Sequence, residues 1–233
     1  MTSSPTTPSP ATPSQSGLVD TGEMVLIHTF MRREFRLASG VVRRVAPGDV
    51  ARAAEVAAHL DFLGRFLHEH HSVEDELLWP MLLERVPDEL APIVHLMEAQ
   101  HEGVEGTLAT IGALLPRWRE SAGLALRDQL ASAYDELYVA LAEHLEAEEQ
   151  RLLPIVSRTL SQAEWDALGT EGRRRGSFRE GPLVVGMFQY EGDPVVFARM
   201  IAHAPRPVRA IFPRVARRAF RKHAQLIHGT PTP

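Results

Sequence analysis

Two segments of the chain, 74 residues apart, carry the same pattern of histidine, glutamate and proline. In both, a His precedes a Glu by four positions and a Pro follows that Glu by six: His70, Glu74 and Pro80 in the first, and His144, Glu148 and Pro154 in the second. Side chains four residues apart lie on one face of a helix, so each pair directs an imidazole nitrogen and a carboxylate to the same point. Imidazole and carboxylate are the ligands that iron, manganese and zinc accept in proteins.

Each copy also has a histidine upstream at nearly the same distance. His28 lies 42 residues before His70, and His101 lies 43 residues before His144. We expect all four histidines on inward helix faces, because apolar residues surround them at helical spacing. Ionisable groups that are buried without partners cost several kcal/mol each, so they should pair with one another or bind metal. The doubled pattern therefore predicts a site for two metal ions.

The other histidines are weaker candidates. On a helix His71 points about 100° away from His70, so we expect it at the surface or in outer contacts of the site. His59, His68 and His95 are interpreted as surface or packing residues.

The elements that must position these side chains are helices, because apolar residues recur with helical periodicity nearly throughout the chain. Breaks at Pro47-Gly48, Pro87-Asp88 and Gly123 separate four long helices. These are expected at about residues 20–45, 49–84, 89–119 and 123–158. Long helices joined by short loops indicate an all-α fold, an up-down-up-down antiparallel four-helix bundle. Pro80 and Pro154 fall late inside two of the helices and should kink or break them.

The rest of the chain divides into two further parts. Residues 1–17 are rich in Ser, Thr and Pro and are expected to be a disordered tail before the bundle of residues 18–160. Residues 161–233 are expected to form a small, basic, helical C-terminal extension packed on the bundle. It should begin with a capping box at Ser161–Glu164, continue through an Arg- and Gly-rich linker at 172–181, and end in short helices around 183–189, 194–203 and 208–227.

Composition narrows the chemistry. The chain has no cysteine, which excludes disulfides, thiolate metal sites and a Cys nucleophile. It has no apolar run of membrane-spanning length and no secretory signal, so a cytoplasmic location is expected. Residues 1–169 hold 13 Arg and Lys against 26 Asp and Glu, whereas residues 170–233 hold 12 against 4. The basic end should therefore dock on the acidic bundle or meet a separate anionic partner.

On the motifs above, the chain resembles the hemerythrin family, and in particular the bacterial hemerythrin-like (HHE cation-binding) proteins. The resemblance covers about residues 20–160 and rests on the order His…His-x-x-x-Glu…His…His-x-x-x-Glu. It implies a non-haem centre of two iron ions, oxo- or hydroxo-bridged, between the four helices. Carried over by motif position, it implies His28 and His70 on one iron, His101 and His144 on the other, and Glu74 and Glu148 as bridging carboxylates.

The chain departs from the oxygen-carrying hemerythrins at two positions. Those proteins have a further His one turn after the third ligand, where this chain has Glu105, a possible seventh ligand. Their last carboxylate follows its His by five residues, whereas here Glu148 follows by four and Glu149 by five. We favour Glu148 because it matches Glu74, and Glu149 stays an alternative. A carboxylate in place of an imidazole favours the ferric state, and hence redox turnover over reversible oxygen carriage.

Several functions remain open at this stage. The resemblance implies a protein that senses or reacts with oxygen, peroxide or a related small oxidant, with peroxidase-, catalase- or oxidase-like turnover as enzymatic forms. No catalytic residue is assigned, and the sequence does not indicate an oligomeric state. The alternative is a regulatory or interaction module whose basic extension binds an anionic partner while the metal is structural or sensory. Nucleic acid is not the expected partner, because the acidic bundle offers the extension a closer opposite charge.

Two rival metal proteins have little support. A ferritin-like site needs a Glu-x-x-His on each of two helices, and only Glu98–His101 has that form. A zinc hydrolase of the His-Glu-x-x-His kind would need a second His at Ser72.

Overall fold

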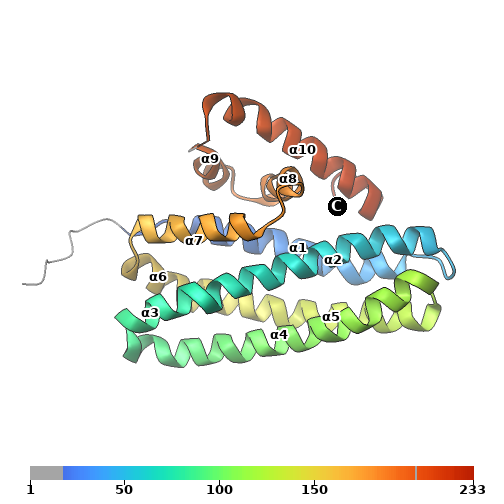
Figure 1. The fold of residues 1–233 in the computed structure, drawn as a ribbon, viewed down its shortest axis with the longest axis horizontal. Helices are drawn as coiled ribbons and strands as arrows, with labels where there is room; N and C mark the ends of the chain where they lie inside the picture. Colours follow the sequence, from blue (N-terminus) through green and yellow to red (C-terminus); the bar gives the residue numbers. More distant parts are fainter. Residues whose placement is uncertain (1–17, 203) are drawn as a thin grey trace, which may run out of the picture.

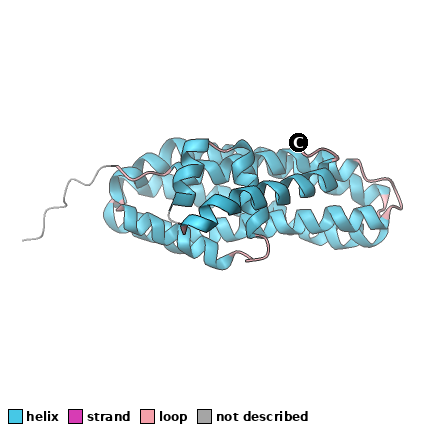
Figure 2. Cartoon of the chain, turned by 90° about the horizontal axis from the view of Figure 1, so that it is seen from above, coloured by secondary structure: helices cyan, strands magenta, loops and turns pink. Residues whose placement is uncertain are grey.

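Two pairs of antiparallel helices form an elongated bundle, with further helices laid along one side of it (Figure 1). The computed structural model describes residues 18–202 and 204–233. The expected disordered tail lies outside the described residues, as does His203, which we placed at the end of a short helix. All regular elements of the described part are helical (Figure 2), as the sequence predicts.

The bundle consists of four helical rods, two of which are continued past a short irregular turn. The rods are α1 (Gly22–Arg43), α2 with η1 and α3 (Val50–Val73, Glu74–Leu78 and Trp79–Arg85), α4 (Pro87–Ser121), and α5 with η2 and α6 (Leu124–Ala147, Glu148–Leu152 and Leu153–Thr159). Helix α1 packs on α5 and α2, and α4 packs on α5 and α2, which is the arrangement of an up-down-up-down bundle. The fold class is therefore the one predicted.

The rod boundaries follow from caps and turns. Asp49 accepts a hydrogen bond from the backbone N–H of Arg52 (3.0 Å) and caps α2. The preceding Gly48 has a positive φ of 83°, which glycine adopts without strain. Ala122 takes the left-handed conformation that ends α4, so the turn expected at Gly123 begins one residue earlier.

The interruptions expected at Pro80 and Pro154 take the form of π-helical turns just before each proline. In η1 the N–H of Trp79 bonds to the carbonyl of Glu74, five residues back, and in η2 the N–H of Leu153 bonds to that of Glu148. Proline has no N–H to continue an α-helical ladder, and one wider turn before it lets the rod continue in the same direction. Both π-helical turns begin at a glutamate of the doubled motif.

The buried apolar side chains form two clusters, one toward each end of the bundle. Along α4, Met97 belongs to one cluster and Val104 to the other, and His101 lies between them. Along the last rod, Leu145 and Leu152 flank Glu148 in the same way. The polar residues of the doubled motif therefore cross the middle of the bundle, between two apolar layers that hold the helices in place.

The C-terminal extension lies on the side of the bundle formed by α1 and α2 (Figure 1). It comprises α7 (Gln162–Arg175), α8 (Gly181–Glu191), α9 (Pro194–Ala202) and α10 (Arg206–His228). The capping box at Ser161 and Glu164 is present. Helix α7 continues into the first four residues of the expected linker and ends at Arg175, where Arg174 and Arg175 both pair with Glu171 one turn back.

Contacts between the extension and the bundle use charges of both signs. Arg175 binds Glu76 (2.7 Å), and Arg199 pairs with Asp20, as the charge asymmetry suggests. Arg65 of α2, however, binds Glu180 of the extension (2.9 Å). The basic residues of α10 contribute less to this docking than their number suggests. No helix among the described residues is long and apolar enough to cross a membrane.

Candidate metal centre

The middle of the bundle brings the predicted residues together as two sets of potential metal ligands. One set comprises His28, His70, Glu74 and Glu148, and the other comprises His71, Glu74, His101 and His144. Within each set the ligand atoms all lie within 4.8 Å of one another. Glu74 belongs to both sets, so its carboxylate stands between two possible ion positions.

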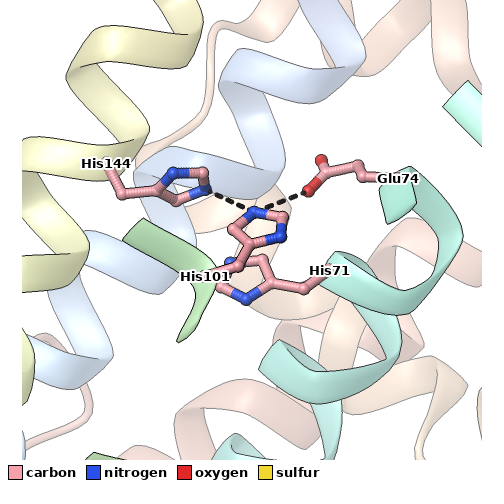
Figure 3. Close-up of side chains that lie close together, drawn as sticks. All are labelled: His71, Glu74, His101 and His144. Atoms are coloured by element: carbon pink, nitrogen blue, oxygen red, sulfur yellow. Dashed lines mark hydrogen bonds and ion pairs between the residues drawn. The ribbon is translucent and has the colours of Figure 1, made fainter. Parts of the chain in front are cut away.

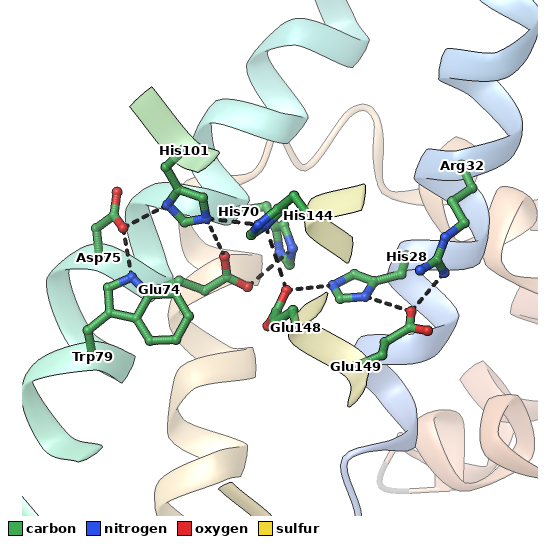
Figure 4. Close-up of polar contacts among 10 residues, drawn as sticks. All are labelled: His28, Arg32, His70, Glu74, Asp75, Trp79, His101, His144, Glu148 and Glu149. Carbon is green, nitrogen blue, oxygen red and sulfur yellow. Dashed lines mark hydrogen bonds and ion pairs between the residues drawn. The ribbon is translucent and has the colours of Figure 1, made fainter. Parts of the chain in front are cut away.

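The first set joins α1, α2, η1 and η2. His28 Nε2 lies 3.3 Å from Glu148 Oε2, and His70 Nε2 lies 3.2 Å from Glu74 Oε1 (Figure 4). The two imidazole rings meet edge to face, with their centroids 5.4 Å apart.

The second set joins α2, η1, α4 and α5 (Figure 3). His101 Nε2 lies 3.2 Å from His144 Nε2 and 3.7 Å from Glu74 Oε2. The ring of His71 stacks on that of His101 at a centroid distance of 4.0 Å. At 3.2 Å these two imidazole nitrogens can share one proton in a hydrogen bond or face a common cation.

These polar atoms are deeply buried and lack hydrogen bonds. His28, His144 and Glu148 are 0% exposed, and Glu74 is 1% exposed. The atoms without a hydrogen-bond partner are His28 Nε2, His70 Nε2, both ring nitrogens of His71, His144 Nδ1, and both carboxylate oxygens of Glu74 and Glu148. Buried polar groups are normally satisfied, and each exception is costly. A pair of metal ions would satisfy most of them at once, so the residues present fit such a centre.

The pKa values of the two inner carboxylates are shifted in opposite directions, as expected of two buried acids without a cation between them. Burial raises the pKa of Glu74 well above its usual value, and the nearby Glu148 raises it further. Burial acts in the same direction on Glu148, but His28 outweighs it and lowers the pKa of Glu148 to about 2. Two carboxylates this close resist ionising together unless a cation lies between them.

Burial also keeps most of the imidazoles neutral. It lowers the pKa of His70 to about 3 and that of His144 to about 4, and it lowers the pKa of His71 well below its usual value. For His28 burial also disfavours the charged ring, but the neighbouring Glu148 overrides it, and the pKa is raised. A neutral imidazole has a free lone pair, which is the form that binds metal.

Outer carboxylates orient one histidine in each set. Glu149 Oε1 lies 2.8 Å from His28 Nδ1, and Asp75 Oδ1 lies 2.8 Å from His101 Nδ1 (Figure 4). A proton held on Nδ1 leaves Nε2 free to face the metal position. Each bridging candidate, Glu74 or Glu148, is thus followed by an acidic residue that positions a histidine of another helix. This geometry favours Glu148 over Glu149 as the inner carboxylate.

His71 is the residue that sequence reasoning misplaced. It is 2% exposed and lies in the second set, rather than at the surface or in outer contacts. The helical angle between His70 and His71 means that the two rings cannot face one point, but Glu74 belongs to both sets, so each ring can belong to a different set. Adjacent histidines on α2 can therefore each face a different position.

Glu105 is not brought into either set. Its side chain is 43% exposed and lies beside His68, with 3.3 Å between Oε1 and Nδ1. The third imidazole of the second set comes instead from His71 on α2, and a solvated carboxylate loses less by staying outside. Glu105 lines a surface pocket of about 470 Å³ beside His101, together with Asp75, Trp79, Pro80, Leu83, Glu98 and Glu102.

Comparison with known proteins agrees with this geometry. The hemerythrin HHE cation-binding domain matches residues 20–156, which include both sets of ligands and all of the bundle except the last three residues of α6. The chain belongs to the hemerythrin HHE cation-binding family. No curated protein and no solved structure matches the chain. Membership makes this a metal-binding, hemerythrin-like protein, and the two sets of His and Glu are where the metal can bind.

Proposed function

We propose that this hemerythrin-like protein holds a non-haem centre of two iron ions, which reacts with or senses oxygen, peroxide or a related small oxidant in the cytoplasm. One ion would be held by His28, His70, Glu74 and Glu148, and the other by His71, His101, His144 and Glu74. The observation that carries the proposal is that Glu74 belongs to both sets and has no hydrogen bond on either oxygen. Bound iron would supply redox chemistry, because each ion can change its valence.

The residues of the chain would hold the ions and limit what reaches them. Two carboxylates offset part of the metal charge, and the neutral imidazoles complete the coordination. Asp75 and Glu149 keep the protons of His101 and His28 on Nδ1, away from the metal. The apolar layers on both sides exclude bulk water and strengthen every charge interaction inside.

The pocket beside His101 favours a small neutral reactant. Asp75, Glu98, Glu102 and Glu105 give its walls four carboxylates, which repel anions. Oxygen and hydrogen peroxide are uncharged at neutral pH and small enough to pass between packed side chains. The choice between sensing and turnover depends on the redox potential of the ions.

The test is metal analysis of the purified protein, with optical spectra before and after adding peroxide. Two irons per chain and near-ultraviolet absorption typical of bridged ferric ions are expected. The variant Glu74→Ala should lose both ions, whereas Glu105→Ala, which changes an exposed carboxylate of α4, should keep them. A chain that contains no iron, or zinc alone, would contradict the proposal.

A second candidate function rests on α10. The helix carries seven exposed cations, and none of them forms an ion pair with a carboxylate among the described residues: Arg206, Arg209, Arg214, Arg217, Arg218, Arg221 and Lys222. Val208, Ile211 and Val215 are exposed beside them. Exposed cations without carboxylate partners, next to apolar side chains, would suit an anionic partner, with the metal acting as a structural or sensory element. Salt-sensitive retention on anionic vesicles, absent with neutral vesicles, would support this role; equal behaviour on both would oppose it.

A further inference from the structure

A second group of potential ligands lies where the C-terminal extension meets the bundle. It comprises Glu34 of α1, His59 of α2 and His228, the last residue of α10, whose ligand atoms lie within 4.8 Å of one another. The side chains of Glu34 and His59 are 0% exposed, and that of His228 is 3% exposed. His59 precedes His70 by three turns of α2, about 16 Å, so this group is separate from the centre described above.

The distances within the group suit ligands around an ion. Glu34 Oε2 lies 3.3 Å from His59 Nε2 and 3.3 Å from His228 Nε2. Hydrogen bonds from an imidazole to a carboxylate are usually shorter, about 2.7–2.9 Å, and the buried His59 Nε2 has no hydrogen-bond partner. Ligands bound tetrahedrally to zinc at about 2.0–2.1 Å stand about 3.3–3.4 Å from one another.

Neighbouring side chains hold the three ligands in place. Arg33 Nε and Nη2 both donate to Glu34 Oε1 (2.9 and 2.7 Å), which leaves Oε2 facing the two imidazoles. His223 Nε2 lies 3.0 Å from His59 Nδ1 and can accept its proton, which directs the lone pair of His59 Nε2 toward Glu34. Glu191 lies 3.6 Å from Arg33 Nη1 and offsets part of the positive charge of the site. In protein metal sites, ligand carboxylates and imidazoles are commonly hydrogen-bonded through the atom that does not face the metal, and Glu34 and His59 are arranged in this way.

We propose that Glu34, His59 and His228 bind a divalent cation of the zinc class, and that this ion clamps the end of α10 to the bundle. One carboxylate and two imidazoles form a ligand set that zinc and its neighbours accept, with water completing the coordination. The clamp acts where Arg52 of α2 already donates to the carbonyl oxygens of Leu226 and Ile227 (2.6 and 2.7 Å). Cation binding therefore couples the docking of the basic extension to the supply of metal.

The proposal is tested on the full chain after loading with iron, by titration with Co²⁺ and Zn²⁺. The wild-type protein should bind one ion more than the variants His228→Gln and His59→Gln, with a Co²⁺ absorption spectrum typical of tetrahedral coordination. The control His95→Gln, at an exposed position of α4, should behave as wild type. Iron content and helical circular dichroism should be the same in all four proteins, which separates a lost ligand from misfolding and from any failure of the iron centre.

Hydrogen exchange measures the clamp itself. Zn²⁺ should slow exchange at the C-terminal end of α10 more than about tenfold in the wild type and not in His228→Gln, because a ligand that binds only the docked form stabilises it. If the wild type binds no ion beyond those that the variants bind, the group is a hydrogen-bonded network and the proposal is wrong. If the ion binds but leaves exchange in α10 unchanged, the clamp is refuted.

Discussion

Among the single residues of the metal centre, Glu74 is the one that links the two ligand sets. One of its oxygens faces His70 (3.2 Å) and the other faces His101 (3.7 Å), and these histidines belong to different ligand sets. Its raised pKa follows from burial and from the proximity of Glu148. A carboxylate placed this way is stable in its ionised form only when cations lie near it.

His71 is predicted to be the third imidazole of the second ion position. In His71→Ala, the affinity for that ion should fall more than about tenfold, because its remaining ligands would be His101, His144 and the shared Glu74. Iron content after extensive dialysis and the near-ultraviolet spectrum measure the loss. His68→Ala changes an exposed histidine of the same helix and should leave both unchanged. An unaltered iron content in His71→Ala would mean that this ring only packs against His101.

The outer carboxylates should contribute unequally. Asp75→Asn and Glu149→Gln keep a hydrogen-bond acceptor for His101 and His28 but remove its charge, and such changes typically cost about 10–100-fold in metal affinity. Arg32 binds Glu149 (2.7 Å) and already offsets its charge, whereas Asp75 is bonded by the neutral indole of Trp79 (2.8 Å). We therefore expect the larger loss in Asp75→Asn.

Competition with a metal chelator measures this difference in affinity. Glu146→Gln, a surface change on the same helix as His144, is a suitable control. Equal losses in the two variants would contradict the role given to Arg32.

Among single residues, the sequence predicted the positions of the six motif residues better than those of His71 and Glu105. The sequence selected two His-x-x-x-Glu pairs by their spacing on one helix face and His28 and His101 by their matched distance upstream, and all six residues lie in the two sets that could hold metal. His71 was missed because a face defined by angle describes one metal position, and this centre offers two. The side chain of Glu105 could not be placed, because its partner His68 belongs to another helix and lies 37 positions away.

At the scale of elements, the rods were predictable and the turns inside them were not. Apolar periodicity and local caps such as Asp49 act over a few residues, so they can be recognised in a sequence. Pro80 and Pro154 signalled an interruption, but a kink and a π-helical turn are both ways to accommodate a residue that has no N–H to donate. The packing of the bundle decides between them, and the π-helical turns begin at Glu74 and Glu148, which lie inside the bundle.

The docking of α8 on α10 depends on one glycine. A Cβ at Gly186 would overlap the carbonyl oxygen of Ala216 and the side chain of Phe220, which are parts of the packed α10. Gly186→Ala is therefore expected to destabilise the extension by about 1–3 kcal/mol. Gly172→Ala in α7 meets open space and should stabilise the protein by about 0.5–1 kcal/mol through the helix propensity of alanine. Denaturant unfolding of both variants measures the two effects, and a Gly186→Ala protein as stable as the wild type would show that α8 and α10 pack more loosely than described.

At the scale of the whole molecule, the bundle is two apolar layers joined through a polar middle. The layers hold the helices at both ends, so the fold does not need metal to define its topology. The middle layer is different, because carboxylates and imidazoles without hydrogen bonds reduce the free energy of unfolding wherever they are buried. Metal binding should therefore change local stability far more in the middle of the bundle than at its ends.

Removal of the metal is expected to loosen one zone of the protein. After chelation, backbone amides of η1 and η2 should exchange with solvent faster, because opening there lets the buried Glu74 ionise in water and lets water reach the free imidazoles. Amides near Leu63 of α2 and Leu130 of α5 should change little. These residues lie in the apolar layer nearer the turns that join α1 to α2 and α4 to α5. Hydrogen exchange measured by mass spectrometry on the iron-loaded and chelated protein resolves these segments. If protection falls uniformly along all four rods, the metal stabilises the fold as a whole and the layers are not independent; if it falls only at the two π-helical turns, the polar middle is a separate unit whose order depends on its ions.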